Sequence, residues 1–125
     1  MRKIALIGLL TIFLLAAAGC RDLSKGTPAP PAIEATKYYA VLLANGSVYF
    51  GQLEGLGSPY PVLRDVYYIQ SNVNQETKAV ANALVKRGKE LHQPDRMIIN
   101  EKAIIFVEPV GPDSRVAQLI KESKQ

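Results

Sequence analysis

The chain of 125 residues contains one cysteine, one histidine and no tryptophan. A single cysteine cannot form a disulfide within the chain, so the fold must be held together by its apolar core. The net charge is also small, because fifteen Lys and Arg residues are opposed by eleven Asp and Glu residues. Acidic and basic residues alternate along most of the chain, without the block of like charge typical of a nucleic-acid-binding tail. Charge alone therefore gives no indication of nucleic-acid binding. The length of the chain allows one domain.

The chain has no apolar run long enough for a membrane-spanning helix. Its longest run, residues 4–18, follows the basic residues Arg2 and Lys3. A spanning helix needs about 20 apolar residues, so this run has the length of the hydrophobic region of a signal peptide. The run ends in small residues, Ala16–Gly19, directly before Cys20. This order of residues resembles the lipobox of bacterial lipoproteins.

The lipobox resemblance implies a signal peptide over residues 1–19, cleavage before Cys20, and acyl chains such as palmitate on Cys20. Ala17 stands where the motif most often has Leu, which is a tolerated departure. Several acyl chains anchor a protein stably to a membrane. Arg21 follows the cysteine where lipoproteins retained in the inner membrane carry Asp, so the outer membrane is favoured. We expect an envelope protein that faces the periplasm or the exterior; the alternatives are an uncleaved anchor and a plain signal peptide with an incidental cysteine.

Residues 20–36 are expected to form a lipidated tether. They include three prolines among small and polar residues, a composition typical of a semi-rigid linker without a fixed fold. Such a linker would hold the following domain away from the membrane surface. The alternative, a strand packed on the domain, is disfavoured by the prolines.

Residues 37–111 have the pattern of a small β-domain, in which short apolar segments alternate with turn residues. Asn45-Gly46 predicts a hairpin, and Gly51 predicts a bend or bulge. Alternation places Leu63, Asp65 and Tyr67 on one face of the third segment. The predicted strands cover residues 38–43, 48–53, 62–70, 79–88, 97–99 and 104–110.

Two segments have apolar residues at helical spacing. Ala79–Lys86 has apolar residues at helical spacing as well as a place between strands, and we favour a strand. Residues 112–125 are predicted to form a C-terminal α-helix that starts near Pro112, with Val116, Leu119 and Ile120 on one face. The predicted fold is mainly β: a five- to six-stranded Sm/SH3-like barrel with a C-terminal helix, preceded by the signal peptide and the disordered linker.

The stretch from Val41 to Val66 resembles the first motif of Sm-like barrels. The shared residues are Leu43, Asn45-Gly46, Gly51, Leu53, Gly55 and the Leu63-x-Asp65 pair. The stretch MIINEKAIIFVEPV resembles the second motif more loosely. The RNA-contact residues of Sm proteins are missing, because residues 57–60 read GSPY and Asn100-Glu101 stands where Arg-Gly is expected. The resemblance therefore implies the fold and leaves the ligand open.

The whole domain resembles more closely an uncharacterised bacterial family of small β-barrels. Its pattern, NGxVYFGxL … LxDVYY … LVKxGxELHxPxxxMxIN … ILFxE … DSxVxxxI, is matched from Asn45 to Ile120. Gln93 departs from it, since Gly is expected there. The resemblance strengthens the domain boundaries and implies no activity.

One polar loop carries the single histidine, His92, with Glu90, Asp95 and Arg96 close by. One histidine and two carboxylates in this stretch lack the spacing of a recognised metal site, so we expect no metal and no cofactor. The functional hypothesis is a partner-binding site formed by His92, Asp95, Arg96 and the aromatic residue Tyr60. The alternative, which we favour, is a loop held by its own hydrogen bonds and by the neighbouring charges of Asp95 and Arg96.

The six tyrosines lie between Tyr38 and Tyr68. Adjacent tyrosines on a strand place their rings on opposite faces, so some are core residues and others lie at the surface. Exposed tyrosines suit binding to a protein or a glycan. The alternative, cross-strand aromatic pairing that stabilises the sheet, is favoured. Asp65 is expected to cap backbone donors at a bend of the sheet.

No serine lies in a nucleophile motif, no pair of carboxylates has a defined spacing, and no glycine loop suits a phosphate. We therefore expect no enzyme. The hypothesis is a lipid-anchored protein of the cell envelope, with a binding or scaffolding module, an envelope protein as partner and no nucleic acid. The alternatives are an Sm-like nucleic-acid-binding oligomer and a peptidoglycan-acting or other envelope enzyme. The sequence does not indicate an oligomeric state.

Overall fold

The computed structural model describes Gly26, Pro28–Ala29 and residues 31–125. The predicted signal peptide, Cys20 and the first part of the tether lie outside these residues. The elements are β1 (Tyr38–Leu43), β2 (Val48–Glu54), β3 (Val62–Val73), β4 (Val80–Lys86), β5 (Arg96–Ile98), the 3₁₀-helix η1 (Glu101–Ala103), β6 (Ile104–Pro109) and α1 (Arg115–Glu122). The six predicted strands and the C-terminal helix are confirmed, including the strand favoured at Ala79–Lys86.

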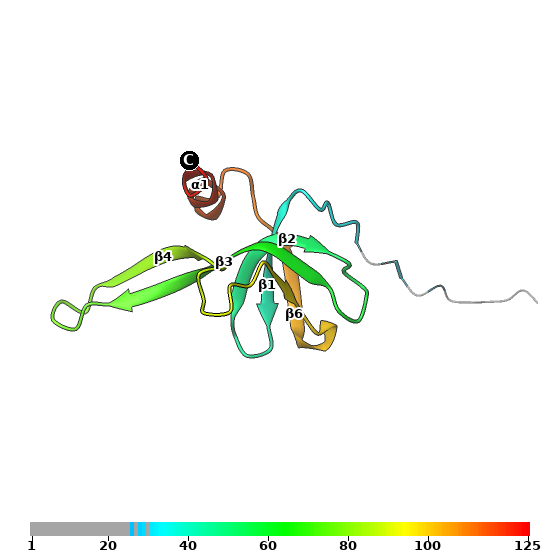
Figure 1. Ribbon diagram of the computed structural model, residues 1–125, viewed down its shortest axis with the longest axis horizontal. Helices are drawn as coiled ribbons and strands as arrows, with labels where there is room; N and C mark the ends of the chain where they lie inside the picture. The colour runs from blue at the N-terminus through cyan, green and yellow to red at the C-terminus, as the bar shows by residue number, and fades with distance from the viewer. Residues whose placement is uncertain (1–25, 27, 30) are drawn as a thin grey trace, which may run out of the picture.

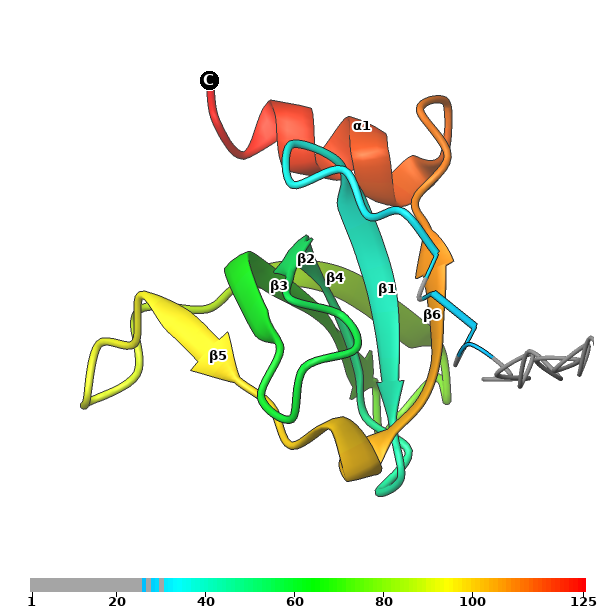
Figure 2. The same ribbon diagram turned by 90° about the vertical axis from the view of Figure 1, so that its right-hand side faces the viewer.

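The strands form one antiparallel sheet in the order β4-β3-β2-β1-β6 (Figure 1). The long strand β3 pairs with β4 over residues 67–73 and with β5 over residues 62–64. The segment β5-η1-β6 therefore connects β3 to β1 around the curled sheet (Figure 2). Within the described residues, no ladder joins β5 to β6. The mainly β fold is confirmed, and its sheet is not closed into a complete barrel.

The predicted β1–β2 turn is present between Leu43 and Val48. Gly46 has a φ of +84°, and the Ser47 N–H donates to the Asn45 side chain at 3.0 Å. The backbone conformation at Gly46 is one that glycine adopts without strain. This turn sets the register in which Val41 pairs with Tyr49.

A β-bulge bends β3 opposite Gly51. Phe50 pairs with Tyr67 and Gln52 pairs with Arg64, so two residues of β3 lie opposite one residue of β2. A Cβ atom at Gly51 would lie 2.7 Å from the Arg64 carbonyl oxygen, so only glycine allows the two strands this approach. The predicted bend at Gly51 is therefore confirmed.

The bulge overturns the predicted faces of β3. Asp65 has a φ of +47°, in the left-handed region, and it takes the place of the extra residue. Leu63 and Val66 are both buried in the core inside the curled sheet, whereas Tyr67 belongs to a second cluster. The alternation that placed Leu63, Asp65 and Tyr67 on one face is wrong, because the extra residue reverses it.

The core has two parts, on opposite sides of the sheet. The first lies inside the curl and consists of Tyr39, Val41, Leu53, Leu63, Val66 and Ile99. The second lies under α1, where Ile120 packs on Phe50 and Tyr67, with Val116 beside them. The Ser114 hydroxyl caps the helix by accepting from the Ala117 N–H at 3.1 Å. The apolar stripe of α1 therefore covers one face of the sheet.

Candidate functional site

The outer half of the β3–β4 hairpin projects beyond the rest of the domain (Figure 1). All residues from Ile69 to Ala83 are exposed. The Asn74 side chain fixes the turn by accepting from the N–H groups of Glu76 and Thr77 at 2.9 and 3.0 Å. The hairpin is thus an ordered two-stranded arm whose far end makes no contribution to either core cluster.

One face of this arm carries an apolar stripe. Cross-strand pairing puts Ile69 opposite Leu84 and Val73 opposite Val80 on the same face, with Ser71 opposite Asn82 between them. The side chains of Ile69, Val73 and Val80 are 47%, 51% and 62% exposed. Leu84 packs against the cluster under α1, so the stripe continues outward from the covered part of the sheet. An ordered apolar stripe that remains open to solvent suits contact with a partner.

The outer edge of β4 has no strand beside it in the described part of the chain. The Asn74 N–H donates to the Ala79 carbonyl and the Arg87 N–H to that of Val66, one bond at each end of the ladder. Antiparallel ladders alternate, so the backbone groups of Val80, Asn82 and Leu84 point away from β3. These groups form an open row of donors and acceptors.

The composition of β4 from Val80 to Val85 gives this edge none of the usual protection. Exposed edges are commonly blocked by charged side chains, proline or bulges. Between Ile69 and Val85 the only charged residues are Glu76 and Lys78, both at the turn. Sequence reasoning missed this site, although the uncharged stretch from Ala79 to Val85 next to a polar turn was a signal for it.

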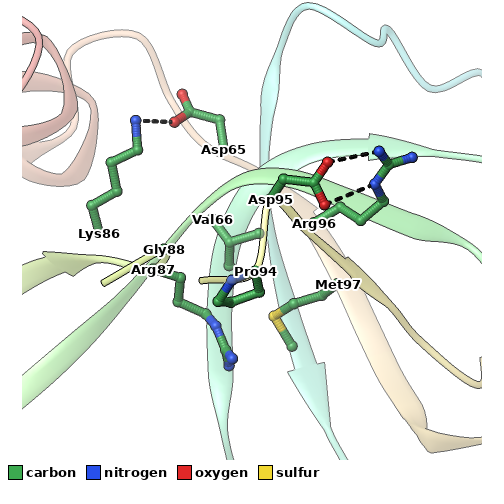
Figure 3. A pocket seen from close by; sticks show the side chains of 9 residues that line it. All are labelled: Asp65, Val66, Lys86, Arg87, Gly88, Pro94, Asp95, Arg96 and Met97. Carbon is green, nitrogen blue, oxygen red and sulfur yellow. Dashed lines mark hydrogen bonds and ion pairs between the residues drawn. The ribbon is translucent and has the colours of Figure 1, made fainter. Parts of the chain in front are cut away.

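A charged cavity of about 380 Å³ lies at the base of the hairpin (Figure 3). Lys86, at the end of β4, contacts Asp65 at 3.0 Å on one side of it. Asp95 and Arg96 form a two-pronged ion pair on the other side, at 2.7 and 3.0 Å. Both carboxylates are therefore neutralised by a neighbouring cation. The cavity offers a polar recess next to the point where the edge of β4 ends.

Asp65 is the centre of a network that joins β3, β4, β1 and α1. Its carboxylate accepts from the Tyr38 hydroxyl and contacts Lys124 at 2.9 Å. Burial would raise the pKa of Asp65, but the hydrogen bonds from Tyr38, Lys124 and Lys86 outweigh it and lower the pKa to about 2. The hydrogen bonds to Tyr38 and Asp65 raise the pKa of Lys124.

The predicted role of Asp65 needs a correction. Its partners in the described residues are side chains, not the backbone donors that the sequence suggested. The reason is that Asp65 is itself the residue of the bulge with a positive φ, and its side chain there contacts Tyr38, Lys86 and Lys124. Asp65 thereby ties the C-terminal helix to the bend of the sheet, a structural task.

The four predicted partner-binding residues do not form one site. Asp95 and Arg96 line the charged cavity, whereas His92 and Tyr60 do not. His92 is exposed in the loop before β5, and Tyr60 is 64% exposed in the loop before β3, beyond the other end of β5. The ion pair with Arg96 lowers the pKa of Asp95.

The loop around His92 is held by its own contacts. The Gly88 N–H donates to the Glu90 carboxylate at 2.7 Å, and Arg87 contacts Glu90 at 3.3 Å. The hydrogen bond from Gly88 lowers the pKa of Glu90. These bonds and the Asp95–Arg96 pair agree with the favoured interpretation of this stretch as a loop held by its own hydrogen bonds and by neighbouring charges.

The tyrosine pairs are mainly structural. Tyr49 and Tyr68 pair across β2 and β3 with ring centroids 6.4 Å apart, and Tyr38 and Tyr67 lie 6.3 Å apart, both edge to face. Such pairs stabilise a sheet. Tyr60 is the tyrosine that lies mostly exposed.

Among the described residues, no group of three or more His, Cys, Asp and Glu side chains is placed to hold a metal ion. In the same part of the chain, no helix is both long and apolar enough to cross a membrane. No known family model matches the sequence, and no curated protein is significantly similar to it.

Proposed function

We propose that this protein is a lipid-anchored binding module of the cell envelope, and that it binds a partner protein along the open edge of β4. The lipobox ending at Cys20 and the Pro-rich tether support the anchor. The projecting hairpin supports the binding role, because it combines unpaired backbone groups with an exposed apolar stripe. The observation that carries the proposal is this unprotected edge of β4.

The mode of binding follows from the chemistry of the edge. An extended segment of the partner adds a strand beside β4 and pairs with the outward backbone groups of Val80, Asn82 and Leu84. Alternate side chains of that segment pack on the apolar stripe beside Ile69 and Val80. Main-chain hydrogen bonds supply affinity, and the side-chain contacts supply specificity.

The anchor is tested by the intact mass of the protein from the membrane fraction of a bacterial host. The proposal predicts a chain that starts at Cys20 and carries acyl chains, and a Cys20→Ala variant that lacks them. An unprocessed or unacylated mass would remove the anchor from the proposal.

The binding mode is tested with two variants of one residue. Asn82→Pro removes an outward N–H while remaining compatible with an edge strand. Asn82→Ala is the matched control, because it keeps that N–H and loses the same side-chain bond to Ser71, which is 2.7 Å long. Partners that co-purify with the wild-type protein from membranes should remain with Asn82→Ala and be lost with Asn82→Pro. Equal recovery with both variants would refute strand addition; a second copy of the chain as the captured partner would identify the module as self-associating.

A further inference from the structure

A second cavity is lined by residues of α1 and of the segment that leads into β1. Figure 2 shows both of these elements at the top of the molecule. Its volume is about 560 Å³, within the range of small-molecule sites, which is about 300–1,000 Å³. Val110, Pro112, Ala117 and Ile120 line its walls, together with Tyr38. The groove is thus mostly apolar and is closed on one side by the helix.

The charged groups that line this groove all have the same sign. Lys37, Lys121 and Lys124 line it, and among the residues that the structure describes no carboxylate does. Lys37 contacts Glu34 at 2.6 Å, but both side chains are 61% exposed, so this pair is weak. Lys124 is held by Asp65 and Tyr38. Lys121 makes no ion pair within the described part of the chain.

We propose that this groove binds a single-chain amphiphile with an anionic head, of the class of long-chain fatty acids. The apolar walls take the acyl chain, because removing both apolar surfaces from water together is favourable. Lys121 and Lys37 reach the carboxylate at the rim, since lysine extends a flexible stem that keeps its ammonium in water. Charge complementarity decides the class of ligand, because an uncharged or cationic amphiphile gains nothing from Lys121 and Lys37.

This inference does not rest on strand addition at β4. The groove involves β1, the segment after β6 and α1, whereas the open edge and the apolar stripe belong to the β3–β4 hairpin. Failure of either proposal therefore leaves the other standing.

The test uses the full chain in membrane vesicles and a palmitate analogue that carries a photoreactive diazirine in its chain. After irradiation, the labelled peptides are mapped by mass spectrometry. We expect saturable labelling within residues 109–124, suppressed by excess palmitate and much less by excess hexadecanol, which has the same chain without the charge.

Three variants complete the test. Ala117→Trp fills the groove and should abolish the saturable labelling. Lys121→Glu changes an exposed residue and should lower labelling about fivefold. Lys102→Glu alters an exposed lysine on η1 that does not line the groove, and should have no effect. Equal competition by hexadecanol, labelling that does not saturate, or labelling unaffected by Lys121→Glu would overturn the proposal.

Discussion

Replacing Asp65 by Asn removes the charge at the centre of the network while preserving the backbone. Asn is, like Asp, among the residues best suited to the positive φ that this position has. The variant therefore isolates the carboxylate from the strain of the bulge. It leaves Lys86 and Lys124 without the anion that both contact.

The size of the effect follows from the pKa of Asp65. Its value falls from 3.8 to about 2 in the folded protein, and each unit corresponds to about 1.4 kcal/mol. The charge therefore stabilises the fold by about 2 kcal/mol at neutral pH. Because the folded pKa is the lower one, this contribution is complete above 3.8 and disappears as the pH falls to about 2.

The assay is urea unfolding of wild type and Asp65→Asn at several pH values between 7 and 2, on a form of the protein that lacks the signal peptide. The gap in free energy of unfolding should be about 2 kcal/mol at pH 7 and should close as the pH approaches 2. Asp113→Asn, at an exposed aspartate without an ion pair in the described residues, should match wild type throughout. A gap that is absent at pH 7, or that persists unchanged at pH 2, would refute the assigned role of Asp65.

Three further substitutions test the packing, each by the free energy of unfolding. Gly51→Ala should lower the free energy of unfolding by about 1–3 kcal/mol, because the added methyl group meets the Arg64 carbonyl. Gly26→Ala is its control, because a Cβ atom there has nothing within 4 Å. Equal losses in the two variants would contradict the close approach at Gly51. Ser114→Ala should cost about 1 kcal/mol through loss of the helix cap, and an unchanged stability would show that α1 does not depend on it. Tyr38→Phe should lower the free energy of unfolding by about 1.5 kcal/mol, because it removes a hydroxyl that is hydrogen-bonded to two charged side chains. Tyr60→Phe, at an exposed tyrosine, should leave it unchanged. The same loss in both variants would argue against the network around Asp65.

The strands could be predicted because their signals are local. Turn residues such as Asn45-Gly46 bracket each apolar segment, and the close approach at Gly51 needs glycine. The faces of β3 could not be predicted, because a bulge reverses the alternation and only the pairing with β2 reveals it. The end of β3 was also missed, since residues 71–73 are part of a polar stretch that resembles a turn.

The candidate sites could not be predicted from the sequence, because they depend on the three-dimensional arrangement of distant residues. Asp65 lies 27 residues from Tyr38, and Lys124 lies 86 residues from Tyr38, so no spacing in the sequence joins them. His92 is the single histidine and Tyr60 is an aromatic residue in a polar loop, yet β5 separates them. The open edge of β4 depends on which strand ends the sheet, and this order is a property of the topology.

A partner strand on the edge of β4 can be detected by amide hydrogen exchange. The outward N–H groups of Asn82 and Leu84 are compared in native membrane vesicles and after purification away from partners. Strand addition predicts slow exchange in the vesicles and fast exchange in the purified protein, with Ala81 and Ala83 protected in both because they pair with β3. Fast exchange of Asn82 and Leu84 in both preparations, with Ala81 and Ala83 still protected, would contradict it.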